Sequence, residues 1–204
     1  PAGSSPADTF TYTAAPAGRY SVADAVADWI GGGTWGTFNT PTVPDLTDYT
    51  VTPVTPAAPG TFATASNAYF RLGTGDYTSG PTGDTVTITG SNKIIEFADN
   101  AILGKVVLGA GASNILFYSQ NPRMSYIFSI QRQNGSAAVS DIIFDGLNID
   151  DSITVANTPA ESDDGTYGGT RMAHIGCHIR QGRRFALFAT MNAGVEDYLV
   201  GNCL

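Results

Sequence analysis

The stretch Asp141-Ile-Ile-Phe-Asp-Gly-Leu-Asn-Ile149 decides the fold that we expect for this chain. A dense run of β-branched and aromatic residues comes first, followed by one glycine and a second, shorter apolar pair. Asp141 opens the stretch and Asp150 and Asp151 close it, and no helical periodicity runs through it. Apolar runs of this length with turn residues at both ends are typical of buried β-strands. We therefore predict a buried strand here.

Imperfect copies of this stretch recur along the chain. They lie at Asn92–Phe97, Asn114–Phe117, Gly176–Ile179, Asp197–Val200 and 202–204. A polar residue or glycine opens each copy, and successive copies follow one another by about 21 to 30 residues, a period that indicates a solenoid. In a solenoid each unit buries its apolar face only against its neighbours. Because no helical pattern lies between the copies, we predict an all-β solenoid of the β-helix type.

The chain resembles a known family at this point. Tyr69-Phe-Arg-Leu-Gly-Thr-Gly-Asp-Tyr77, followed by Thr85-Val-Thr-Ile-Thr-Gly90, is similar to the start of a pectate-lyase-like right-handed parallel β-helix. The resemblance covers roughly residues 62–204. It implies a right-handed parallel β-helix over residues 61–204, of the kind found in phage spike and decoration proteins. Fold alone does not imply an activity.

Residues 1–60 are expected to form an N-terminal arm. Eight of the eleven prolines lie there, which argues against an ordinary central sheet. Ser21–Ile30 has the one good helical pattern, with Ser21 as its cap and Val22, Val26, Trp29 and Ile30 on one face. In the family that the chain resembles, a helix before the first rung covers the end of the core, so we expect a short capping helix. The alternative is a helix that docks on another subunit. The rest of the arm should lie on the solenoid or on a neighbouring chain.

The composition excludes several classes of partner. The net charge is −8 and only 14% of the residues are charged, with Lys93 and Lys105 as the two lysines. An acidic balance argues against nonspecific binding of nucleic acid. No apolar run approaches the roughly 20 residues of a membrane span. We therefore expect neither nucleic acid nor a membrane as partner, and favour an extracellular or virion β-protein. Pro1 is expected to be a mature end, left after removal of a signal or of an initiator methionine.

Cys177 and Cys203 are the two cysteines, about one repeat apart. In the alignment above each follows the same position, so we expect them to stack on adjacent rungs, with Cα atoms near the ~4.8 Å strand spacing. Buried free thiols are the favoured interpretation. A disulfide is geometrically possible but unusual between parallel neighbours in register.

The segment from Arg171 to Arg184 is rich in basic residues and contains no acid. Apolar residues alternate with polar ones between Ile175 and Ile179, which predicts an outward face shared by His174, Gly176, His178 and Arg180. Such a face could bind an acidic sugar or a phosphate. The alternative is a solvated face, or one that pairs with acids of a neighbouring protomer. The candidate ligand-binding residues are Arg171, His174, His178, Arg180, Arg183 and Arg184.

If the chain is an enzyme, the catalytic candidates are His174, His178 and Arg180. The resemblance to lyases implies that an arginine would help to abstract the proton α to a uronate carboxylate. Seven acids between Asp141 and Asp164 could instead bind Ca²⁺ or cleave a glycosidic bond. Their spacing places no two at a required separation, so we interpret them as polar turn residues. We predict no metal site and no cofactor.

Two functions remain open. The favoured one is a non-catalytic structural component of a bacteriophage virion, either a capsid decoration or a spike-like β-helix protein. It would be a homotrimer with arms crossing between protomers, attached to other virion proteins such as the capsid, and the uncapped C-terminal end of its solenoid would need a neighbour. The alternative is a secreted, extracellular protein or a tailspike. That protein would be a polysaccharide lyase, a glycoside hydrolase or a carbohydrate-binding module that takes a surface polysaccharide.

Overall fold

The computed structural model describes residues 49–57, 62–77, 85–132, 139–150, 169–180 and 195–203. These residues are all-β, and they contain no helix. The all-β prediction is therefore confirmed for this part of the chain. The helix predicted at 21–30 and most of the expected arm lie outside the described residues.

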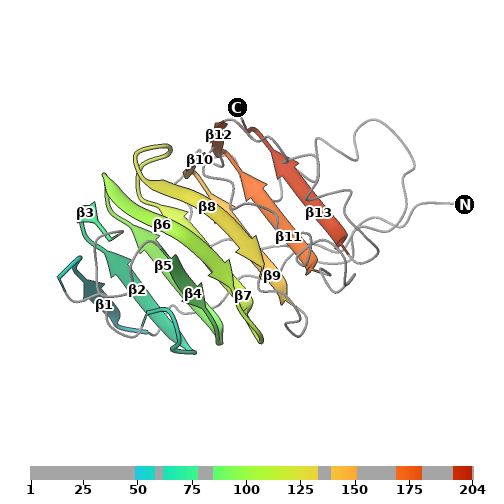
Figure 1. Cartoon of the computed structure of the whole chain (residues 1–204), viewed down its shortest axis with the longest axis horizontal. Helices are drawn as coiled ribbons and strands as arrows, with labels where there is room; N and C mark the ends of the chain where they lie inside the picture. The colour runs from blue at the N-terminus through green and yellow to red at the C-terminus, as the bar shows by residue number, and fades with distance from the viewer. Residues whose placement is uncertain are drawn as a thin grey trace, which may run out of the picture.

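Two parallel sheets make up the fold (Figure 1). The seven-stranded sheet has the order β1 (Val51–Val54), β2 (Ala68–Leu72), β5 (Ser91–Phe97), β7 (Ser113–Ser119), β9 (Val139–Asp145), β11 (Gly169–Ile175) and β13 (Val195–Gly201). The six-stranded sheet has the order β12 (His178–Arg180), β10 (Asn148–Asp150), β8 (Tyr126–Arg132), β6 (Ala101–Leu108) and β3 (Gly75–Asp76), with β4 (Thr85–Ile88) also on β6. From β4 onward the chain passes alternately from one sheet to the other, so neighbours within a sheet are next but one in sequence.

The single strand predicted at Asp141–Ile149 is wrong, because the stretch forms two strands in different sheets. β9 ends at Asp145 and β10 begins at Asn148. Gly146 lies between them with φ +67°, a left-handed conformation that glycine adopts without steric cost. The glycine in the middle of the stretch therefore turns the chain from the seven-stranded to the six-stranded sheet.

The repeat alignment is confirmed by the strand register. Asn114–Phe117 and Asp141–Phe144 lie side by side, with Phe117 paired to Phe144. The copies at Gly146–Ile149 and Gly176–Ile179 are also neighbours, because Ile149 pairs with Ile179. Residues that align in the sequence therefore meet their counterparts on the adjacent strand.

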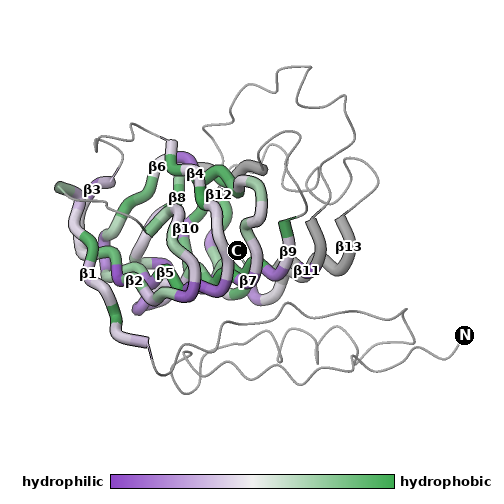
Figure 2. Tube along the Cα trace, turned by 90° about the horizontal axis from the view of Figure 1, so that it is seen from below, coloured by the Kyte–Doolittle hydropathy of each residue, from purple (hydrophilic) through white to green (hydrophobic). Residues whose placement is uncertain are grey.

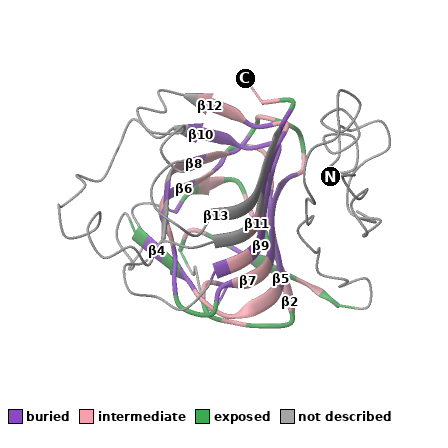
Figure 3. Ribbon diagram, turned by 90° about the vertical axis from the view of Figure 1, so that its right-hand side faces the viewer, coloured by how far each residue is buried: buried purple, intermediate pink, exposed green. Residues whose placement is uncertain are grey.

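The two sheets face each other (Figures 2 and 3). Buried apolar residues of both sheets form the core between them. Its largest fully buried members include Tyr77, Phe62, Phe97, Phe117, Phe144, Leu72, Ile88, Ile95, Leu103, Leu108 and Ile115. Burying one such side chain contributes about 1.5 to 3 kcal/mol. The core therefore runs along the stack and joins each strand to its neighbours in both sheets.

Left-handed residues stack at the entrance to the seven-stranded sheet. Asn67, Asn92 and Asn114 have φ between +52° and +55° and hold equivalent positions at the starts of β2, β5 and β7. The Asn92 side-chain amide donates to Asn67 Oδ1 at 2.9 Å, and that of Asn114 donates to Asn92 Oδ1 at 3.2 Å. Asparagine tolerates the left-handed region better than most residues. Asparagine thus adopts the left-handed conformation at each of these turns, and its side-chain amide links one turn to the next.

Replacing Asn92 with alanine should destabilise the fold more than replacing it with glycine. Alanine loses both amide contacts and is strained at φ +55°, whereas glycine loses only the contacts. We expect alanine to lower the free energy of unfolding by about 2 to 3 kcal/mol and glycine by about half as much. Urea denaturation measures both. Equal, small losses for the two variants would contradict the left-handed ladder.

Candidate functional site

Arg171, the first of the candidate ligand-binding residues, is bound to an acid of the neighbouring strand. Its Nε donates to Asp141 Oδ1 at 2.7 Å and its Nη2 to Asp141 Oδ2 at 2.6 Å. The two residues follow Asn114 along the stack of left-handed residues, with φ of +55° for Asp141 and +56° for Arg171. A bidentate guanidinium–carboxylate pair is a strong and geometrically specific contact. Arg171 therefore ties β11 to β9.

His174 does not lie on the outward face that the sequence predicted. Its side chain is buried, and its ring stacks on Phe144 with a centroid distance of 4.8 Å. Phe144 stacks in the same way on Phe117, also at 4.8 Å. The three rings form an aromatic row across β7, β9 and β11 on the core side of the sheet. Burial lowers the pKa of His174 from 6.5 to about 3, so the imidazole is neutral at ordinary pH.

The turn at Gly176 explains why the predicted alternation of inward and outward residues does not hold from His174 to Arg180. Gly176 has φ +59° and separates β11, which holds His174, from β12, which begins at His178. A face that alternates along one strand does not continue through a turn into another sheet. His174 and His178 therefore belong to different sheets and form no common site.

The remaining basic candidates do not complete a site among the described side chains. His178 is half-buried and pairs in register with Asn148, and Arg180 pairs with Asp150. The backbone of Arg180 is described but its side chain is not, and Arg183 and Arg184 lie outside the described residues. Of the acids proposed for calcium or glycoside chemistry, Asp151, Glu161, Asp163 and Asp164 also lie outside the described residues.

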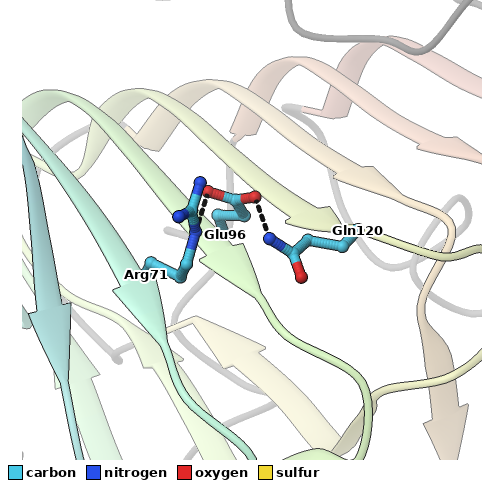
Figure 4. A network of polar contacts seen from close by, with 3 residues as sticks. All are labelled: Arg71, Glu96 and Gln120. Carbon is cyan, nitrogen blue, oxygen red and sulfur yellow. Dashed lines mark hydrogen bonds and ion pairs between the residues drawn. The ribbon is translucent and has the colours of Figure 1, made fainter.

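A polar network that the sequence did not reveal lies on the outward face of the seven-stranded sheet (Figure 4). Arg71 Nε donates to Glu96 Oε2 at 2.8 Å, and Gln120 Nε2 donates to Glu96 Oε1 at 2.7 Å. Burial and the neighbouring Glu96 raise the pKa of Tyr69 to about 12, so this phenol stays protonated. Arg71 pairs directly with Glu96 across β2 and β5. This contact could have been predicted only if the pairing of these two strands had been known.

Lys93 is a second unexpected feature, because its side chain is fully buried without a carboxylate among its recorded acceptors. Its Nζ donates to the backbone oxygens of Phe62, Ala63 and Thr89 at 3.1, 3.0 and 2.6 Å. Burial lowers its pKa from 10.5 to about 8. The three contacts match the three donors of an ammonium group. Lys93 thus fastens the segment before β2 to the turn after β4.

The predicted stacking of Cys177 and Cys203 is confirmed. Ile175 pairs with Gly201, so the two cysteines follow at equivalent positions, and both are free thiols. Cys177 is buried and its Sγ lies 3.4 Å from the oxygen of Phe144, whereas Cys203 is half-buried and its Sγ lies 3.4 Å from the oxygen of His174. Burial raises the pKa of the Cys177 thiol, so this group is a poor nucleophile.

The described residues offer no group of three or more His, Cys, Asp or Glu side chains that could hold a metal ion. Within the same ranges, no helix has the length and apolar character needed to cross a membrane. In comparisons with known proteins, no family model, curated protein or solved structure matches this chain.

A double-mutant cycle should show that Asp141 and Arg171 are coupled. Asp141→Gly and Arg171→Gly each remove one partner while keeping a residue for which positive φ carries no steric cost, and neither introduces a new side-chain contact. We expect a coupling energy of roughly 1 to 2 kcal/mol in urea denaturation, because the pair is bidentate and Asp141 is largely buried. A coupling energy near zero would mean that the contact adds nothing to the fold.

The buried His174 should make stability depend on acid. The unfolded chain binds a proton near pH 6.5 and the folded chain only near pH 3, so unfolding takes up a proton between these values. The free energy of unfolding therefore falls as the pH falls below 6.5, by roughly 1.4 kcal/mol per pH unit from this group. In His174→Phe, which keeps an aromatic ring in the row, this component should vanish. Parallel pH profiles for the two proteins would refute the buried imidazole.

Proposed function

We propose that this protein is a non-catalytic structural component of a bacteriophage virion, built as a right-handed parallel β-helix related to the pectate-lyase-like family. It would serve as a capsid decoration or a spike-like protein and would assemble as a homotrimer. Two parallel sheets between which the chain alternates support this fold, because a β-helix produces that order of strands.

One observation carries the non-catalytic part of the proposal. Several described groups that could perform chemistry are instead engaged in contacts within and between strands. Arg171 binds Asp141, Glu96 binds Arg71 and Gln120, and His174 is buried in the core. A general acid or base must reach the proton that it transfers. A scaffold needs rigidity instead, and polar contacts between successive strands supply it.

A polysaccharide lyase or a carbohydrate-binding module is the second candidate. His178 and the strand β12 favour it, because this half-buried imidazole lies near the edge of the six-stranded sheet, beside Asn148. Arg180 on the same strand would supply the charge that an acidic sugar requires. Under this alternative the protein would be secreted or would belong to a tailspike.

Two measurements separate the candidates. Light scattering or native mass spectrometry gives the mass of the particle, and absorbance of unsaturated uronates reports lyase activity on acidic polysaccharides. We expect three chains per particle and no turnover. Turnover that disappears in His178→Ala or Arg180→Ala, while the fold is retained, would overturn the structural proposal in favour of the lyase. A particle with the mass of a single chain would contradict the proposed homotrimer.

A further inference from the structure

The outward face of the seven-stranded sheet carries an apolar row that is buried. Ile94, Leu116, Ile143 and Ala173 pair in register across β5, β7, β9 and β11. Their exposed fractions are 4%, 0%, 1% and 0%. Each of the first three precedes an inward-facing core residue, Ile95, Phe117 or Phe144, so it points away from the core. A second row beside it, which includes Glu96, Tyr118, Asp145 and Ile175, is buried as well.

Strand β6 of the opposite sheet does not behave in this way. On β6 the outward positions Ile102, Lys105 and Val107 are all half-exposed, as expected for a sheet with one face in water. The exposure of the seven-stranded sheet also depends on position. The side chain of Arg71, on β2 near the sheet edge, is 44% exposed, whereas that of its neighbour Glu96 is 5% exposed. The middle of the outward face is therefore covered, and the face is more open at β2.

The described strands do not supply that cover. They form the two sheets, and the described part of the six-stranded sheet lies on the core side (Figure 3). These exposed fractions refer to a single chain. The burial of this row is therefore not explained by the described strands, and it is the observation from which the proposal starts.

We propose that the segment before Tyr49 binds along this row and forms a third layer of the protein. The segment has 48 residues. It enters directly at the edge of this sheet, because β1 begins at Val51 and pairs with β2. The seven strands span six spacings, about 29 Å in all, which an extended chain covers with about nine residues. The segment is long enough to cross the face more than once.

The chemistry of the segment fits the row. It contains Val22, Val26, Trp29 and Ile30 at helical spacing, followed by Trp35. Glu96, in the second row, accepts hydrogen bonds from Arg71 and Gln120, so its carboxylate has polar partners within the sheet. The connections at 151–168 and 181–194 are the other long segments that could be considered. Each joins the end of a strand in the six-stranded sheet to the first residue of β11 or β13, so both of its ends are held at strand termini, whereas the segment before Tyr49 is held at one end. This inference does not depend on the virion proposal.

Tryptophan emission tests the proposal directly, because both tryptophans, Trp29 and Trp35, lie in the segment. Leu116→Asp and Ile143→Asp place a charge in the middle of the row. We expect the emission to shift to longer wavelength and acrylamide quenching to rise in both variants of the full-length protein. Val107→Asp is the matched control, since it adds the same charge on the outward face of the other sheet. Its emission and quenching should equal those of the wild type.

A second kind of variant keeps the test decisive if Leu116→Asp or Ile143→Asp does not fold. Val26→Asp with Trp29→Asp alters only the segment, so the far-ultraviolet circular dichroism of the sheets should persist while binding of an apolar dye rises. Wild-type emission in Leu116→Asp, with circular dichroism retained, would overturn the proposal and assign the cover to another connection. Wild-type emission that shifts on dilution would also overturn it, because the segment would then come from a second copy.

Discussion

The structure depends on the parallel, in-register pairing of strands that lie next but one in sequence. This pairing places residues of equivalent sequence position next to each other at the ~4.8 Å spacing between strands. A residue that repeats along the chain must therefore tolerate contact with its own kind. Asparagine amides satisfy this condition because each donates to the next, as Asn92 does to Asn67. Aromatic rings satisfy it by stacking, as Phe117 and Phe144 do.

Charged residues at equivalent positions on adjacent strands are stable neighbours when their charges are opposite. Asp141 and Arg171 continue the positions occupied by Asn67, Asn92 and Asn114, and they replace the amide contacts with a charge pair. Arg71 and Glu96 do so on the outward face of the sheet. Like charges at these positions would repel at short range in a partly buried setting. The low charge content of the chain is therefore consistent with the stacking.

The sequence predicted the features that a repeat makes visible. The alignment of Asn114–Phe117 on Asp141–Phe144 gave the strand register, and the shared position of Cys177 and Cys203 gave their stacking. It did not predict the site, because alternation was extended through Gly176, where the chain changes sheets. His174 was placed outside for that reason and is in fact in the aromatic row. The Arg71–Glu96–Gln120 network was missed because its members are distant in sequence and meet only through the pairing.

The stack of left-handed asparagines offers the most direct test of this pairing. In protein labelled with ¹⁵N at asparagine, nuclear Overhauser spectra report which side-chain amides are close together. We expect cross peaks from the Asn92 side-chain amide to those of both Asn67 and Asn114, since it lies between them in the ladder. Absence of both cross peaks, together with the Hα–Hα contacts of antiparallel strands, would contradict the parallel stacking.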